Sequence, residues 1–232
     1  MLGASLLGRF LAVLLAVLGV GRLGAGVIFW RAANKLERPS YEVLKTIGDN
    51  VQLRRYDPYL IAETEVADAG MREGTGKGFG VVAGYIFGKN KPKSKMAMTA
   101  PVRIASERPT PAKGEKMAMT APVRSETGGR TGSTKVSFVI GSKYTLRTAP
   151  TPMDRSVRVR NVAPHLLAAR TFSGPPPSEK RVARERAKIL AAMDENGLRP
   201  ADKETLVYGY HDPFMTPGFL RRNEVCIRVI EV

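Results

Sequence analysis

Residues 95–103 read KMAMTAPVR, and residues 116–124 read KMAMTAPVR a second time. In an extended chain the two methionines of each copy point to one side, and the alanine and threonine between and after them point to the other. A proline follows in each copy (Pro101 and Pro122), and it has no N–H for a strand ladder, so each copy should end at a sheet edge or a bend. The segment between the copies, IASERPTPAKGE, is typical of an exposed loop. The repeat therefore predicts two similar strands that pair antiparallel with each other.

The methionines of the repeat, among them Met98 and Met119, are candidates for lining a binding site. Methionine is flexible and fills irregular space, so it suits a core or the wall of a pocket that adapts to a flat ligand. Two Met-x-Met pairs also offer thioethers to Cu(I), although no Cys or His lies near them in the sequence. An axial thioether to a haem iron is a third interpretation. No metal site is predicted from these alternatives.

Composition predicts one domain of moderate size, because 43% of the 232 residues are hydrophobic. Lys and Arg number 37 against 21 Asp and Glu, a net charge of +16 that favours anionic partners such as a phospholipid surface or a carboxylate-bearing ligand. The basic residues are scattered and form no nucleic-acid-binding module, so nucleic acid is not an expected partner. Cys226 is the only cysteine in the chain, which excludes an intrachain disulfide and predicts a buried structural thiol.

The N-terminal segment is apolar enough to enter a membrane. An uninterrupted apolar run covers Phe10–Gly21, and after Arg22 a second apolar stretch ends at Trp30. This span is long enough to cross a bilayer, and no A-x-A cleavage site follows it. We expect residues 1–38 to form an uncleaved membrane anchor with a linker, and residues 39–232 to form a domain on the periplasmic or exported side. A cleaved signal peptide, giving a secreted protein, and a plastid transit segment are the alternatives.

Alternating apolar and polar residues predict strands on both sides of the repeat. The predicted strands cover residues 41–46, 51–56, 59–66, 135–140, 144–148, 157–162, 165–172, 204–210 and 224–232. The first three are separated by short turns and read as a meander.

Two helices are predicted between these strands. The first covers residues 71–88, and its apolar face consists of Phe79, Val82, Ala83, Ile86 and Phe87. The second begins after a capping serine, Ser178, and ends at Gly197. The order strand, helix, strand thus occurs twice, which predicts an α+β fold built from a duplicated unit with pseudo-two-fold symmetry.

Several stretches of the chain resemble the SOUL/haem-binding protein family. They are YEVLKTIGDNVQLRRYDPYLIAETEV, GYIFGKN, KMAMTAPV in both copies, FVIGSKYTL, TPMDRSVRV and DPFMTPGFLRRNEV. They cover residues 41–230 in the right order, which is far more than a short-motif coincidence. The resemblance implies a distorted β-barrel with two helices, similar to the effector-binding domains of bacterial multidrug-responsive regulators. It also implies binding of haem or other tetrapyrroles without an established enzymatic activity. Bacterial members with this layout are membrane-anchored or exported, and plant members can be plastid proteins.

The resemblance implies an apolar binding cleft beside the first helix, which here corresponds to Phe79, Val82, Ala83 and Ile86. The alternative is that this helix face packs on the sheet. Arginines in matching stretches are candidates for pairing with propionates, and solvated surface arginines are the alternative. These arginines are Arg54, Arg55, Arg221 and Arg222.

Iron ligation by histidine has little support in the sequence. A histidine near the N-terminal strands, proposed as the ligand in one family member, has no counterpart, because the chain contains only His165 and His211. Both are expected to be structural or surface residues. We therefore expect haem to be held by apolar contact and propionate pairing rather than by strong axial ligation.

Three classes of function remain, and the first is favoured: a non-enzymatic carrier or buffer of haem or a related tetrapyrrole. The second is a membrane-tethered sensor or interaction module that binds another flat apolar ligand or a protein. The third is an enzyme that modifies a tetrapyrrole, but the sequence contains no Ser-His-Asp, Cys-His, paired-carboxylate or H-E-x-x-H motif that would indicate catalytic residues.

Overall fold

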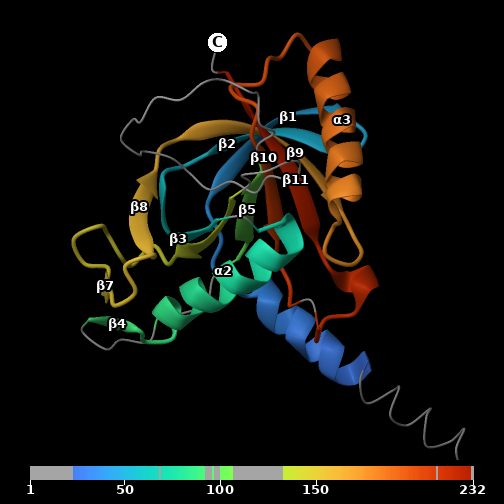
Figure 1. Cartoon of the computed structure of the whole chain (residues 1–232). Coiled ribbons are helices and arrows are strands. Elements are labelled where there is room, and N and C mark those ends of the chain that lie inside the picture. The colour runs from blue at the N-terminus through green and yellow to red at the C-terminus, as the bar shows by residue number, and fades with distance from the viewer. Residues whose placement is uncertain are drawn as a thin grey trace, which may run out of the picture.

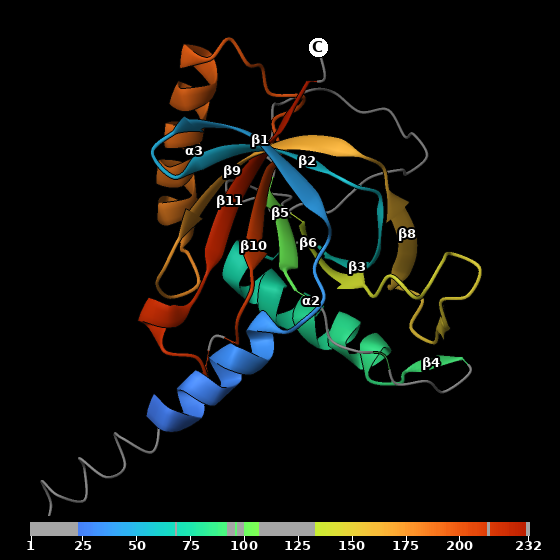
Figure 2. The same cartoon turned by 180° about the vertical axis from the view of Figure 1, so that it is seen from behind.

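The protein, seen here in a computed structural model, consists of a curved antiparallel sheet flanked by helices (Figure 1). The structure describes residues 23–67, 69–91, 96, 100–106, 133–212 and 214–230, and the statements below concern these residues. The elements are β1 Tyr41–Gly48, β2 Val51–Tyr56, β3 Tyr59–Val66, α2 Met71–Ile86, β4 Asn90–Lys91, β5 Val102–Ser106, β6 Thr134–Ile140, β7 Thr151–Pro152, β8 Arg158–Val162, β9 His165–Phe172, α3 Glu179–Glu195, β10 Thr205–Gly209, η1 Gly218–Leu220 and β11 Asn223–Val229. A helix also covers residues 23–34 and leads into β1 (Figure 2).

The order of strands in the large sheet confirms the predicted duplication. The order is β1-β2-β9-β11-β10-β5-β6-β3-β8, with β10 and β5 at the centre. On one side β3, α2, β5 and β6 occur in this order along the chain, with the short β4 between α2 and β5, and on the other side β9, α3, β10 and β11 occur in the same order, with η1 between β10 and β11. The strand that precedes each unit crosses to the other half, because β2 pairs with β9 and β8 pairs with β3. The two halves are therefore interlocked.

The α+β class is confirmed, and the implied distorted barrel takes the form of an open sheet. Its edge strands, β1 and β8, are not paired with each other in the described part of the chain. β4 and β7 form a separate two-stranded ladder. The predicted meander is wrong in one respect: β2 follows β1 in a hairpin, but β3 belongs to the opposite half of the sheet.

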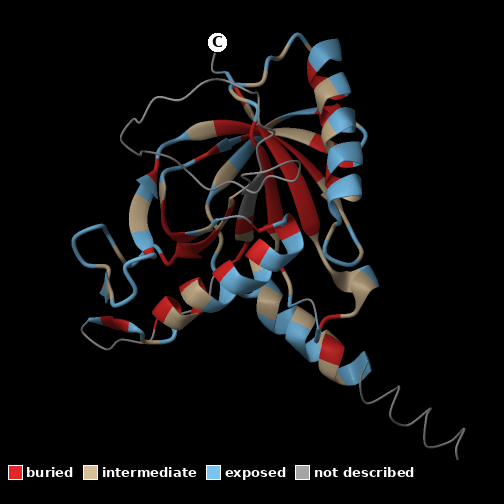
Figure 3. Ribbon diagram, viewed as in Figure 1, coloured by how far each residue is buried: buried red, intermediate tan, exposed pale blue. Residues whose placement is uncertain are grey.

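The two faces of the sheet carry different side chains, as the alternation in β9 shows. Leu166 and Ala168 contact α3 in one apolar cluster, whereas Leu167 and Ala169 belong to another cluster on the opposite face. Helix α2 covers the other half on the same side as α3, and Figure 3 shows both helices buried along one stripe only. We call the sheet face without these helices the inner face. Its apolar cluster comprises Tyr56, Ile61, Ala100, Val139, Val162, Leu167, Ala169, Leu206, Tyr208, Tyr210 and Cys226.

Helix α3 begins and ends as predicted. The Ser178 hydroxyl accepts a hydrogen bond from the Arg181 N–H at 3.3 Å, which satisfies one of the free donors of the first turn. Gly197 follows the helix with a φ of +67°, a conformation that favours glycine. By contrast, the strand predicted at residues 144–148 is wrong: these residues form turns, with the Thr148 N–H donating to the Thr145 carbonyl.

The repeated motif is only partly described. Met96 of the first copy is buried in the cluster beneath α2, which agrees with a core role for that side chain. The strand starts at Val102, so Pro101 precedes β5 instead of ending a strand. Both edges of β5 are occupied, by β6 and β10, so the predicted pairing with the second copy does not involve Val102–Ser106. Residues 116–124, Met98 and Met119 lie outside the described residues.

The predicted membrane anchor also falls largely outside the described residues, which begin at residue 23. In the part that is described, no helix has the length and apolar character needed to cross a membrane. Within the predicted anchor and linker, residues 1–38, the described part is helical over residues 23–34.

The close approach of α2 to β6 gives a stability prediction. A Cβ at Gly78 would lie 2.7 Å from Val136 Cγ2 and 2.9 Å from Val136 Cβ, whereas a Cβ at Gly80 would meet nothing within 4 Å. We expect Gly78→Ala to lower the free energy of unfolding by about 1–2 kcal/mol, because overpacking outweighs the gain in helix propensity. The matched control Gly80→Ala should raise it by about 0.5–1 kcal/mol. Urea unfolding of both variants tests this, and equal effects would contradict the packing argument.

Candidate functional site

A line of polar residues crosses the inner face at the centre of the sheet. Each member is the direct cross-strand partner of the next, so all of their side chains point to the same face. We call this line the inner polar row, and in order across β3, β6, β5, β10, β11 and β9 it comprises Glu63, Ser137, Arg103, Tyr208, Glu224 and Thr171. Polar groups buried in such a position are expected to be hydrogen-bonded, so their partners decide what the row can do.

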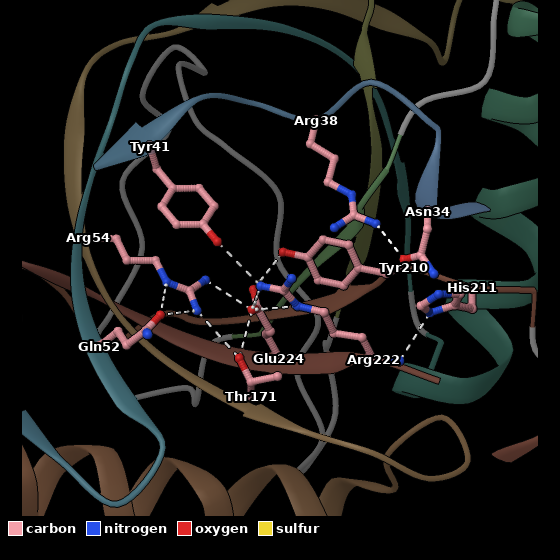
Figure 4. Close-up of polar contacts among 10 residues, drawn as sticks. All are labelled: Asn34, Arg38, Tyr41, Gln52, Arg54, Thr171, Tyr210, His211, Arg222 and Glu224. Carbon is pink, nitrogen blue, oxygen red and sulfur yellow. Dashed lines mark hydrogen bonds and ion pairs between the residues drawn. The ribbon is translucent and has the colours of Figure 1, made fainter. Parts of the chain in front are cut away.

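Glu224 is fully satisfied by protein groups (Figure 4). Its carboxylate accepts hydrogen bonds from Arg54 Nη1 at 3.0 Å, Arg222 Nη2 at 2.6 Å, Thr171 Oγ1 at 2.9 Å and Tyr210 Oη at 2.6 Å. Burial alone would raise the pKa of Glu224, but the charges of the two arginines outweigh it and hold that pKa below its usual range. Glu224 is therefore a buried, ionised carboxylate.

Two of the four predicted propionate partners belong to this cluster. Arg54 is buried and also donates to Gln52 Oε1 at 3.0 Å, and its guanidinium lies over the Tyr41 ring. Arg222 lies over the Tyr210 ring, 4.6 Å from its centroid. All three nitrogens of the Arg54 guanidinium, and Nε and Nη2 of Arg222, thus donate to other groups of the protein. The structure does not support the prediction that these two side chains are free to bind propionates.

The other two predicted arginines lie apart from this cluster. Arg55 forms an exposed pair with Glu42 at 3.4 Å. Arg221 donates from Nε to the Thr216 carbonyl at 2.6 Å, in the loop between β10 and β11. The structure therefore does not bring the four predicted arginines together into one binding site.

The predicted apolar residues of α2 are mostly core residues. Val82, Ala83 and Ile86 are buried against β3 and β6, so the helix face packs on the sheet and these three side chains are not available to a ligand. Phe79, at the margin, is 37% exposed and contacts the Phe138 ring edge to face. The apolar periodicity thus identified the face that packs on the sheet rather than the wall of a cleft.

Arg103, in the middle of the inner polar row, was not predicted from the sequence. It is 2% exposed, and its Nε and Nη1 are buried without a hydrogen-bond partner in the structure as described. The Ser137 hydroxyl, also on the inner face, is likewise buried without a partner there, whereas the Tyr208 and Tyr56 hydroxyls lie beside the Arg103 and Arg54 guanidinium groups, respectively. Burial raises the pKa of Tyr208 and Tyr56 well above the usual value, so both phenols are neutral at physiological pH.

Glu63, the acidic residue of the inner polar row on the β6 and β3 side of Arg103, is already paired with another arginine. Glu63 accepts from Arg160 Nε at 2.8 Å and from Arg160 Nη2 at 3.0 Å, a two-bond pair. Arg103 is therefore a permanently charged guanidinium among neutral hydroxyls, with donors to spare. Burying a charged group whose donors lack acceptors costs folding free energy unless an acceptor or counter-charge binds there. Arg103 is therefore a candidate for binding a ligand.

His165 lies at the start of β9 and stacks on Tyr56, with ring centroids 5.4 Å apart and an interplanar angle of 7°. Its Nδ1 lies 2.8 Å from the Ala163 carbonyl, which places the ring proton there and leaves a lone pair on Nε2. Burial lowers the pKa of His165 to about 4, so the ring is neutral at physiological pH. In the structure as described Nε2 is buried without a partner. His211 has the other tautomer, because its Nδ1 accepts from the Arg222 N–H at 3.0 Å; its Nε2 then carries the proton and is also buried without a partner in the described residues.

Metal-ligating and nucleophilic groups are otherwise sparse in the described part of the chain. No three His, Cys, Asp or Glu side chains there are placed to hold a metal ion together. Cys226 is buried on the inner face, and burial raises the pKa of its thiol well above the usual value, so the thiol is unreactive.

Comparison with solved structures identifies relatives in fold. The C-terminal domain of EcmrR superimposes with a TM-score of 0.51 at 8% identity, covering 83% of this chain and 99% of that domain. An uncharacterized conserved protein from Listeria innocua superimposes with a TM-score of 0.50 at 11% identity, covering 77% of this chain and 92% of that one. At such low identity the likeness concerns the fold alone, and it agrees with the architecture implied by the sequence resemblance.

Comparison with protein families gives the stronger result. No curated protein matches the chain. The model of the SOUL heme-binding protein family matches residues 36–112 and 104–228, which together span almost the whole folded part. The chain therefore belongs to the SOUL heme-binding protein family.

Proposed function

We propose that this protein binds haem or a related tetrapyrrole without changing it chemically, as a carrier or buffer, and that the inner face of the sheet receives a carboxylate of the ligand. Membership of a heme-binding family supports the ligand class. The observation that carries the choice of site is Arg103, a buried guanidinium whose Nε and Nη1 have no partner in the described residues.

The chemistry of the inner face suits an apolar ring that carries propionates. Tyr56 and Tyr208 carry aromatic rings and hydroxyl groups, and Ile61, Leu167 and Leu206 are aliphatic members of the same cluster. These five side chains are buried in the apo structure, so entry of the ligand requires the inner face to open. A carboxylate beside Arg103 would form a charge-assisted hydrogen bond, which is roughly twice as strong as a neutral one. It would also place a counter-charge beside Arg103, whose attraction to the Glu63 carboxylate is shared with Arg160.

Apolar contact and propionate pairing are expected to supply the affinity, with no strong axial ligand to the iron. Haemin and metal-free protoporphyrin IX should then bind the protein equally well. His165 Nε2 is the first nitrogen to test if they do not, because its ring is neutral and its lone pair is free.

A porphyrin titration of the whole chain, followed in the Soret region, tests the proposal. We expect saturable binding of haemin and protoporphyrin IX at micromolar concentration or below, and much weaker binding of octaethylporphyrin, which has no carboxylates. Weak protoporphyrin beside tight haemin would indicate an iron ligand, and His165→Phe would follow. If neither carboxylate-bearing porphyrin binds saturably, the proposal is wrong. Loss of porphyrin absorbance with time would point to an enzyme.

A further inference from the structure

A group of large apolar side chains is exposed at one end of the molecule. Phe214 is 82% exposed, Phe219 is 71% exposed and Ile28 is 68% exposed. Leu23, Phe29 and Met215 are exposed as well. We call these six residues the apolar end. Single exposed apolar residues are common, but a concentration of this kind marks a surface that contacts something apolar.

The apolar end comes from two segments that are far apart in the sequence and packed together. Helix 23–34 supplies three residues, and the loop between β10 and β11 supplies the other three. A Cβ at Gly26 would lie 2.5 Å from Pro217 Cδ and 3.1 Å from the Met215 carbonyl oxygen, so the helix and the loop are in direct contact there. Figure 2 shows the helix running below this loop.

The loop is held by hydrogen bonds that leave its aromatic side chains exposed. Asp212 Oδ1 accepts from the Phe214 N–H at 2.8 Å and from the Met215 N–H at 2.7 Å. Arg221 Nε donates to the Thr216 carbonyl at 2.6 Å and braces the other side of the loop. Folding therefore fixes the loop backbone while the Phe214 and Phe219 side chains remain in water. That arrangement gains nothing from the hydrophobic effect in the isolated protein.

We infer that the apolar end lies on the surface of a lipid bilayer, with Phe214 and Phe219 inserted at the level of the headgroups. In the sequence, helix 23–34 is preceded by the apolar run Phe10–Gly21, which is suited to the same bilayer. The two segments that form the apolar end also contain basic residues: Arg31 lies in the helix, Lys35 follows it, and Arg221 lies in the loop. Together with the net charge of +16, they favour anionic phospholipid.

This contact has a structural consequence for the domain. An anchor alone leaves the domain free to turn on its tether, whereas insertion at a second segment far along the chain fixes its orientation. The β10–β11 loop would be that second segment. The inference concerns a surface remote from Arg103 in the sequence and does not depend on tetrapyrrole binding.

Tryptophan fluorescence in vesicles tests the contact directly. In a Trp30→Phe background, which removes the native tryptophan, Phe219→Trp or Phe214→Trp is introduced into the whole chain. The protein is reconstituted into vesicles of phosphatidylcholine and phosphatidylglycerol with and without brominated acyl chains. We expect a blue shift of the emission and its loss with brominated lipid for both variants. Leu146→Trp is the control, because Leu146 is also exposed but lies in the loop between β6 and β7.

Two outcomes would overturn the inference. Emission from Phe219→Trp and Phe214→Trp that is unaffected by brominated lipid would show that the loop remains in water or is covered by a protein. Equal quenching of these variants and of the Leu146→Trp control would show contact without a preferred orientation. Far-ultraviolet circular dichroism that matches the parent establishes that each variant is folded, which is expected because all three sites are on the surface.

Discussion

Replacing Glu224 by glutamine will lower the free energy of unfolding by about 3–5 kcal/mol, because it removes one charge from a buried, hydrogen-bonded cluster. Glu224 is the carboxylate that joins Arg54 and Arg222, both of which bind its Oε1. Glutamine keeps the shape and can accept some of these hydrogen bonds, but it leaves two guanidinium groups without a counter-charge. Equilibrium unfolding in urea at pH 7 measures the loss.

The effect should depend on pH with a definite sign. The arginines hold the pKa of Glu224 below its ordinary value in the folded protein, so the unfolded chain binds the proton more readily. The stabilisation from Glu224 is therefore complete above the unfolded pKa, about 4.3, and is lost as the pH falls through the lower, folded value. The difference between the parent and Glu224→Gln should accordingly narrow in acid.

An exposed ion pair in the same sheet supplies the matched control. Glu42, whose side chain is 69% exposed, pairs with Arg55 at 3.4 Å on β1 and β2. Glu42→Gln should cost no more than about 0.5 kcal/mol, because an exposed pair gains little from its charges in water. If Glu224→Gln and Glu42→Gln have the same effect, the cluster around Glu224 is not the stabilising element that its geometry indicates.

Local features of this fold could be predicted well from the sequence. Alternation gave the bounds of β2, β3 and β9 as the structure has them, because each strand has one face on the helices and one on the inner side. The Ser178 cap and the terminal Gly197 gave the ends of α3. The order of elements gave the duplication. Strand alternation and helix caps depend on only a few neighbouring residues, so they can be read from the sequence without knowing which strands pair.

Pairing over long distances could not be predicted, and the site depends on it. The exchange of β2 and β8 between the two halves brings Arg54 on β2 close to Glu224 on β11, 170 residues away. Alternation did contain one unused signal: Glu224 shares a strand face with Cys226, for which burial was predicted, and so the acid should have been expected inside. Arg103 had no comparable signal, because its burial follows from the position of β5 between β6 and β10.

Replacing Arg103 by methionine will change stability and ligand binding in opposite directions. Arg103 is buried, and its Nε and Nη1 have no partner in the described structure. Methionine fills similar space without a charge, so we expect the apo protein to gain about 1–3 kcal/mol of unfolding free energy. The same change removes the proposed donor to a propionate, which should weaken the binding of protoporphyrin IX by about 10- to 100-fold.

The two effects can be separated from general damage to the fold with two controls. Arg55→Met removes an exposed arginine from β2, and it should alter neither the unfolding midpoint nor the porphyrin affinity. Octaethylporphyrin, which has no carboxylates, should bind the Arg103→Met variant with the same affinity as it binds the parent.

If the affinities for both porphyrins fall equally, the substitution has changed packing on the inner face and not a charge contact. If Arg103→Met destabilises the apo protein and leaves protoporphyrin affinity unchanged, Arg103 is a structural residue and the carboxylate site must lie elsewhere. Only a gain in stability of the apo protein, together with a loss of affinity for protoporphyrin IX but not for octaethylporphyrin, agrees with an Arg103 side chain that binds a ligand carboxylate.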